Sequence, residues 1–166
     1  MSTISQSGKI TPCLWFNNQA EEAAEFYTSI FPDSEVLNVT RFGKEGKEFH
    51  HMEEGTVMTV MFRIGGLTFT GLNGGPLFNF TEAISFQVSC EGQEETDYYW
   101  NKLTEGGMES SCGWLKDKFG LSWQIIPKEF ITFMSDPDPI RSQRVMKAMF
   151  PMKKIIIADL EKAYKG

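Results

Sequence analysis

An order of one strand, one helix and then further strands occurs twice along these 166 residues. The first copy begins with an apolar run at residues 10–16 and the second with a similar run at residues 84–90, an offset of 74 positions. In each copy a stretch with helical spacing and then strand-like segments follow. The repeat predicts an α+β chain with two modules, about residues 10–75 and 84–127, and a helical tail at about residues 129–166.

Turn and helix-end signals set the boundaries in the first module. Apolar residues at helical spacing occupy residues 20–31, and Pro32 ends this helix. Two β-rich runs at residues 56–64 and 67–72 meet at Gly65 and Gly66, a pair that is typical of a two-residue hairpin turn. A further strand is expected at residues 35–42, and a charged, glycine-bearing loop at residues 43–48 separates it from these two runs. The first module therefore reads as one strand, one helix and three strands.

In the second module a helix is expected at residues 93–105, ending at the glycine pair 106–107, and two strands then fold back at Gly120. The last strand alternates apolar Leu121, Trp123 and Ile125 with polar Ser122 and Gln124. The strand at residues 84–90 alternates Ser85, Gln87 and Ser89 with Phe86 and Val88. Two strands thus present a polar face, which either is solvated, as on many antiparallel sheets, or lines a cavity.

Composition excludes several classes of partner. The net charge is −6 and the basic residues form no stripe, which argues against nucleic acid. No run approaches the roughly 18 apolar residues of a membrane span, and the polar start has no signal-peptide character, so we expect a cytoplasmic protein without membrane contact. Three widely spaced cysteines suit neither a disulfide framework nor a metal knuckle.

The tail is rich in helix formers and methionine. Asp138 followed by Pro139 marks the start of a helix that ends near Pro151, and a last helix is expected at residues 154–165. These helices must bury their apolar stripes. They could pack on the same subunit's sheet or on a partner's, and the sequence leaves both open.

Five segments, taken together with the repeat, resemble the PhnB-like branch of the glyoxalase, bleomycin-resistance and dioxygenase superfamily, also called the vicinal oxygen chelate superfamily. The segments are residues 10–16, 31–34, 71–75, 82–86 and 112–124. The resemblance covers nearly the whole chain. It implies tandem βαβββ modules forming a curved mixed sheet in a single domain, residues 1–166, and a homodimer that binds a small organic ligand.

Members of this branch are often labelled 3-demethylubiquinone-9 3-methyltransferase, a label that implies S-adenosylmethionine. The usual Rossmann-like enzymes that use this cofactor carry a glycine-rich loop between a parallel strand and a helix. The glycine pairs here, at residues 65–66, 74–75 and 106–107, are instead hairpin, loop and helix-stop signals. We therefore expect no methyl transfer and no cofactor.

Metal-using members of the superfamily place His and Glu ligands at positions that the resemblance assigns to Pro12, Thr70, Ser85 and Gln124. None of these is an imidazole or carboxylate donor, so we expect no metal. The two histidines, His50 and His51, are adjacent. In a strand they would point to opposite faces, so they read as a solvated loop pair, or as one side chain reaching a pocket or a subunit boundary.

The resemblance makes the polar face one wall of a cavity. The expected ligand-binding residues are Leu14, Phe16, Thr70, Ser85, Gln87, Cys112, Trp114 and Gln124. Cys112 is either a buried thiol or a nucleophile, but no histidine lies near it in sequence to activate it. No catalytic residue can be assigned. The sequence predicts a metal-free small-molecule-binding protein with an unknown ligand. The alternative is an enzyme that acts on a small organic substrate in the same cavity, an isomerase or lyase in preference to the methyltransferase of the family label.

Overall fold

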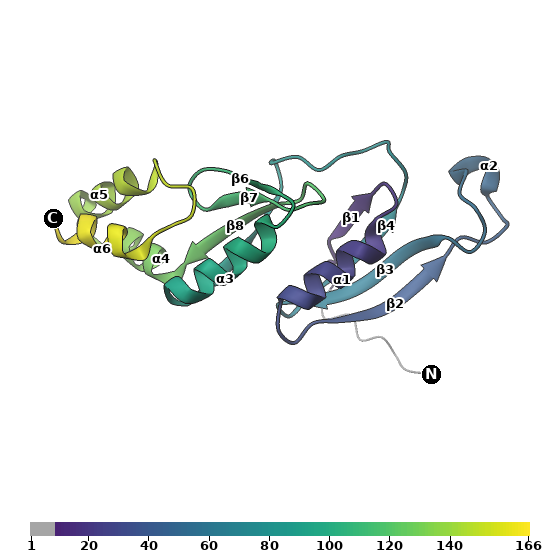
Figure 1. Ribbon diagram of the computed structural model, residues 1–166, viewed down its shortest axis with the longest axis horizontal. Coiled ribbons are helices and arrows are strands. Elements are labelled where there is room, and N and C mark those ends of the chain that lie inside the picture. Colours follow the sequence, from purple (N-terminus) through teal and green to yellow (C-terminus); the bar gives the residue numbers. More distant parts are fainter. Residues whose placement is uncertain (1–8) are drawn as a thin grey trace. The chain divides into compact units, whose positions relative to one another are not determined.

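The computed structural model describes residues 9–166, which form two compact units, one ending at Asn79 and the other beginning at Phe80 (Figure 1). Each unit contains one four-stranded mixed sheet with a helix packed on it. Among residues 9–166 no helix has both the length and the apolar character needed to cross a membrane.

Apart from the single-turn helix α2, the first unit has the element order that the sequence predicts. Its elements are β1 (Cys13–Phe16), α1 (Ala20–Ile30), β2 (Glu35–Arg41), α2 (Lys47–His50), β3 (Val57–Ile64) and β4 (Leu67–Asn73). The strand order in the sheet is β1-β4-β3-β2, with β1 parallel to β4 and the other neighbours antiparallel. The hairpin between β3 and β4 turns at Gly65 and Gly66, whose φ angles of 53° and 79° are the left-handed values that glycine permits.

Helix α1 packs against the sheet of the first unit closely because small residues meet at the contact. A Cβ atom added at Gly71 would lie 3.2 Å from the Cβ of Ala20, and Ala20 is fully buried. The start of α1 is held by β4, since the backbone N–H of Ala20 donates to Oδ1 of Asn73 at 2.9 Å. Asn73 also donates to the carbonyl of Val57 at 3.0 Å, so one buried amide joins the helix to two strands.

The second unit repeats this arrangement. Its elements are β5 (Ser85–Cys90), α3 (Gly92–Thr104), β6 (Met108–Glu109), β7 (Trp114–Lys116) and β8 (Ser122–Pro127), with strand order β5-β8-β7-β6 and β5 parallel to β8. Strands β1 and β5 end 74 residues apart, as do helices α1 and α3. The tandem βαβββ modules and the α+β class are therefore confirmed.

A buried carboxylate fixes the turn between β7 and β8. Oδ1 of Asp117 accepts the backbone N–H groups of Phe119 and Leu121 at 2.9 and 3.1 Å, and Oδ2 accepts the indole N–H of Trp123 at 2.8 Å. Asp117 is 3 % exposed. Three donors directed at one buried carboxylate make it a structural group.

Several boundaries differ from the sequence prediction, and one of them is the start of the last helix, α6 (Ile157–Lys165), which lies at Ile157 rather than residue 154. Strand β1 begins at Cys13 rather than residue 10, because Pro12 lacks an N–H and contributes only its carbonyl, which accepts the N–H of Thr70 at 2.9 Å. The single-turn helix α2 lies partly in the predicted loop. Helix α4 (Lys128–Met134) directly follows β8 and lies in the predicted helical tail, although no separate helix was assigned to these residues.

The tail continues with α5 (Pro139–Met149) and α6 (Ile157–Lys165). Asp138 caps α5 by accepting the N–H of Ile140 at 2.9 Å. The apolar stripes pack within this chain around a buried cluster of Val145, Met149, Ile155 and Leu160, and α4 also contacts β8. Within the described residues, the tail thus buries its stripes on its own unit.

Several hydrogen bonds anchor the tail to the loops and the helix of the second unit. The amide of Gln93 on α3 donates to the carbonyl of Ile155 at 3.1 Å and accepts the N–H of Ile157 at 2.8 Å. The N–H of Gly113, just before β7, donates to the carbonyl of Lys153 at 2.7 Å. These bonds connect the last helix to both the helix and the strands of the unit.

Replacing Asp117 tests the turn. We expect Asp117→Asn to lower the free energy of unfolding by about 2–4 kcal/mol, because the amide's N–H₂ group would face the indole N–H and the charge-assisted bonds would be lost. Urea unfolding measures the change. The matched control is Asp33→Asn at an exposed turn position with a φ of 51°, which asparagine tolerates, and its effect should stay within about 0.5 kcal/mol. Equal effects at both positions would contradict a structural role for the Asp117 carboxylate.

Candidate functional site

The sheet of the second unit has two chemically different faces. On the face toward α3, Leu115, Trp123 and Ile125 are buried to 3 % exposure or less. On the other face, strand register aligns two rows of residues across β5, β8 and β7. One row is Gln87, Gln124 and Trp114, and the other is Ser85, Ser122 and Lys116. The polar face expected from the sequence therefore exists, and we call these six residues the polar sheet face.

Hydrogen bonds between side chains join the two rows. Gln87 donates from Nε2 to Oε1 of Gln124 at 3.1 Å, and Gln124 donates from Nε2 to Oγ of Ser85 at 2.8 Å. Both ends of the Gln124 amide are thus held by neighbours. Each amide and hydroxyl still has capacity for one further hydrogen bond, so the group is oriented but not saturated.

A charged pair borders the polar sheet face. Lys116 lies 2.5 Å from Oε1 of Glu82, and the hydrogen bond from Lys116 holds the pKa of Glu82 below its ordinary value. Glu109 on β6 also has a lowered pKa, first because the Trp100 indole donates to it at 3.0 Å and second because Lys153 donates at 3.2 Å. Both carboxylates are therefore charged at neutral pH.

A small cavity lies between these groups. It has a volume of about 100 Å³, and its lining includes Glu82, Met108, Glu109, Trp114, Lys116 and Ser122. Ser122 is 1 % exposed, and its Oγ has no hydrogen-bond partner among the described residues. Burying a hydroxyl without a hydrogen-bond partner costs about 1–3 kcal/mol of stability, and a polar group of a ligand that enters the cavity could supply the partner that the Ser122 hydroxyl lacks. Because ligand pockets usually measure about 300–1,000 Å³, this cavity suits one functional group of a larger molecule.

Three of the predicted ligand-binding residues, Leu14, Phe16 and Thr70, belong to the first unit. Leu14 and Phe16 are on the α1 side of the first sheet, 6 % and 3 % exposed, and Phe16 lies beside Gly71 under the helix. Their alternation along β1 places them in the core of the first unit, and their role in ligand binding stays a prediction. Thr70 is on the opposite side of the same sheet, half-buried, and pairs with Cys13 and Met61.

Cys112 belongs to the contact with the tail. Its backbone has a φ of 59°, its N–H donates to the carbonyl of Met152 at 2.8 Å, and its side chain packs on the buried cluster of the tail helices. Its Sγ lies 3.8 Å from the carbonyl oxygen of Phe150. The thiol is therefore a packing group in the loop before β7 and is not part of the polar sheet face.

The histidines have local partners in the first unit. Nδ1 of His50 accepts the N–H of Met52 at 3.0 Å, and its ring packs on Phe42 with centroids 4.5 Å apart. His51 is exposed and has a φ of 56°. His50 is half-buried by these contacts, so only His51 matches the expected solvated position.

The residues at the superfamily's metal positions do not fit a tightly bound transition metal. In the first unit Pro12 and Thr70 offer a carbonyl and a hydroxyl, and in the second unit Ser85 and Gln124 are bonded to each other. Transition metals in proteins are held mainly by imidazole, thiolate and carboxylate groups. Across residues 9–166, no group of three or more His, Cys, Asp or Glu side chains could hold a metal ion.

Three groups that line the cavity, Lys116, Ser122 and Glu82, were not predicted as site residues from the sequence. Lys116 could have been found, because it lies two positions after Trp114 and strand alternation puts both on one side. Ser122 was identified as polar, but its burial depends on the tertiary packing of β6 and β7. Glu82 gave no signal, since it lies in the segment before β5 and reaches Lys116 only in the folded chain.

The duplicated βαβββ arrangement and the polar sheet face define a protein of the glyoxalase and vicinal oxygen chelate superfamily. Residues 8–126 match the sequence model of the 3-demethylubiquinone-9 3-methyltransferase family, and the chain belongs to this family, the PhnB-like branch of the superfamily. Helices α4, α5 and α6 lie beyond the matched residues.

Solved structures support the assignment. The PhnB protein of Bacillus cereus is 36% identical over 72% of this chain and 99% of its own, with a TM-score of 0.64. A protein of Pseudomonas aeruginosa, 19% identical over 73% of this chain and 98% of its own, has a TM-score of 0.59. The fosfomycin resistance protein FosX of Mesorhizobium loti, 12% identical over 72% and 90%, has a TM-score of 0.50. The last two show the fold alone. A search of curated proteins found no match.

Thiol reactivity checks the placement of the cysteines. Burial raises the pKa of both thiols, that of Cys90 to about 12, but the Cys90 side chain is fully buried whereas Cys13 is exposed. Because the thiolate is the reactive form, Ellman's reagent at mildly alkaline pH should label Cys13 well before Cys90. Mass spectrometry of the labelled peptides gives the order. Concentrated urea should make Cys90 accessible, and labelling of native Cys90 as rapid as that of Cys13 would contradict the structure.

Proposed function

We propose that this protein binds a small organic molecule at the polar sheet face of its second unit, without a metal. The observation that carries the proposal is the buried hydroxyl of Ser122, which has no partner among the described residues and borders a cavity of about 100 Å³. A hydroxyl or carbonyl group of a ligand would satisfy it and recover part of its desolvation cost.

The neighbours of Ser122 suggest the chemistry of the ligand. Lys116 supplies a cationic donor and Gln124 an oriented amide, while Trp114 offers an aromatic surface in the same row as Gln124. Pockets for small molecules combine apolar surface with a few placed polar groups. A flat, largely apolar molecule with one hydroxyl or carbonyl group fits this set: the polar group enters the cavity and the apolar part lies against Trp114.

Binding is better supported than catalysis. The candidate nucleophile, Cys112, packs against the tail, and Asp117 is engaged by three structural donors. The family's name refers to methyl transfer, but the connections from β1 to α1 and from β5 to α3 carry no glycine-rich loop. No residue of the polar sheet face can yet be given a catalytic role.

On the resemblance alone, we further propose that residues 1–166 act as a single domain and that the protein is a cytoplasmic homodimer. Ser85, Gln87, Trp114 and Gln124 are the proposed ligand contacts on the polar sheet face, with Ser122 and Lys116 added from the structure.

Ser122→Ala separates a binding role from a structural one. We expect the variant to be as stable as the parent or up to about 1 kcal/mol more stable, because a buried hydroxyl without a partner is removed. Its affinity for 2-naphthol, a flat aromatic molecule with one hydroxyl, should fall about threefold to tenfold with the loss of one hydrogen bond.

Urea unfolding and titration of tryptophan fluorescence measure the two quantities. The matched control is Ser89→Ala, at an exposed position on β5, which should change neither. Absence of saturable 2-naphthol binding to the parent, or equal loss in both variants, would contradict the proposed site.

Elemental analysis tests the metal-free state. Protein purified without chelators and then incubated with zinc, nickel, manganese or iron should retain no stoichiometric metal after desalting, because the donors at the superfamily's metal positions are neutral. Gln124→Glu is a useful companion, since it supplies only one carboxylate and should not create tight binding. Stoichiometric metal in the parent protein would overturn this part of the proposal.

A further inference from the structure

The tail has a charge opposite to that of the rest of the chain. Residues 127–166 contain eight of the 16 Lys and Arg residues but only five of the 22 Asp and Glu residues, a net charge of +3 in a chain whose total is −6. The remaining residues therefore carry −9. This asymmetry places a positive surface on helices that lie beyond the residues matching the family.

Ion pairs with carboxylates neutralise most of the positive side chains of the tail and leave the unpaired ones in one place. Five of the eight tail cations form ion pairs: Lys128, Arg141, Lys153, Lys154 and Lys165. Arg144, Lys147 and Lys162 form none with any residue in the described part of the chain. These three residues line the same groove, between α5 and α6.

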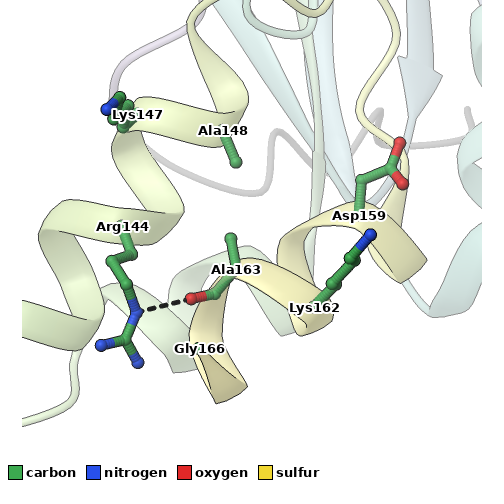
Figure 2. Close-up of a pocket in the computed structure, with 7 residues that line it drawn as sticks. All are labelled: Arg144, Lys147, Ala148, Asp159, Lys162, Ala163 and Gly166. Atoms are coloured by element: carbon green, nitrogen blue, oxygen red, sulfur yellow. Dashed lines mark hydrogen bonds between the residues drawn. The ribbon is translucent and has the colours of Figure 1, made fainter.

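The groove has the dimensions and lining of a small-molecule site. Its volume is about 580 Å³, within the range of about 300–1,000 Å³ that is common for ligand pockets. Figure 2 shows Ala148 on α5 and Ala163 on α6 pointing toward each other across the groove. These small side chains leave the space between the helices open and give it an apolar floor.

Arg144 is held in place at one end of the groove. Its Nε donates to the carbonyl of Ala163 at 2.8 Å (Figure 2), and its Nη2 donates to the carbonyl of Tyr164 at 2.6 Å. Both carbonyls belong to the last turn of α6, where they have no partner within the helix. These bonds occupy one edge of the guanidinium and leave Nη1 available, since an arginine has five N–H donors. A cation fixed in this way loses little conformational freedom when an anion binds.

Lys162 points along α6 toward Asp159, and Lys147 projects outward from α5 (Figure 2). Both lysines are exposed and can turn their amines toward a ligand. Asp159 is the one acidic side chain in the lining. It can accept hydrogen bonds from hydroxyl groups on the part of the ligand that carries no charge.

We infer that the groove between α5 and α6 binds a small organic anion with at least two negative charges and hydroxyl groups, such as a phosphate monoester or a hydroxylated polycarboxylate. Arg144, Lys147 and Lys162 bind the anionic group, Asp159 binds the hydroxyls, and the alanine floor contacts the carbon skeleton. This site is separate from the polar sheet face and does not depend on the function proposed for it.

Calorimetric titration with glucose 6-phosphate and with citrate at low ionic strength tests the inference, with glucose as the uncharged comparison. Saturable binding of either anion, weaker in added sodium chloride and absent for glucose, is expected. The double variant Lys147→Gln/Lys162→Gln should bind about tenfold more weakly or worse, since it loses two charge-assisted contacts. Arg144 is left unchanged because it also completes α6.

The matched control is Lys128→Gln/Lys153→Gln, which removes the same charge from ion-paired tail positions outside the groove. It should retain the parent's affinity, and circular dichroism should show that both double variants are folded. The inference fails if neither anion binds saturably, or if the control loses as much affinity as the groove variant. Ser122→Ala should leave anion binding unchanged, so the two proposed sites stand or fall independently.

Discussion

The sheet of the second unit, which carries the proposed site, depends on the buried carboxylate of Asp117 for the geometry of its turn between β7 and β8. Its bonds to the backbone of Phe119 and Leu121 close the turn, and its bond to the Trp123 indole joins that turn to the α3 face of β8. The side-chain period of a strand is two, so a slip of one residue would exchange the two faces of β8. By fixing the turn, Asp117 determines that Ser122 and Gln124 lie opposite Lys116 and Trp114.

The contents of the two faces follow from that register. The face toward α3 is apolar and buried. The other face carries amides, hydroxyls and one ion pair, and hydrogen bonds between the side chains orient the amides. Gln124 has a particular position in this set, because it occupies a place where metal-using relatives are expected to carry a glutamate and is bonded instead to Ser85 and Gln87. A neutral amide that both donates and accepts can hold its neighbours in place without a metal ion.

Most of the fold could be predicted because its signals are local. Alternation indicates the strands of the repeat, helical spacing indicates the helix of residues 20–31, and paired glycines indicate the turn at Gly65 and Gly66. The elements lie where these signals predict them. The site was predictable only in part. Alternation put Ser85, Gln87 and Gln124 on one face, but Leu14 and Phe16 could not be placed without knowing which side of β1 the helix covers. The ion pair of Glu82 with Lys116 joins segments far apart in sequence, and no periodicity carries that information.

Gly113 is hydrogen-bonded both to the tail and to strand β8. Its N–H donates to Lys153 in the tail, its carbonyl accepts the N–H of Ile125 in β8, and a Cβ atom there would lie 2.8 Å from the carbonyl oxygen of Ile125. The next residue is Trp114. A shortened protein that stops where the family's matched residues stop would leave the N–H groups of Cys112 and Gly113 without their partners directly beside the proposed site. The folding unit of this protein therefore extends beyond the residues that match the family. Helices α4, α5 and α6 lie outside that match, and the tail that contains them helps to shape the sheet of the second unit.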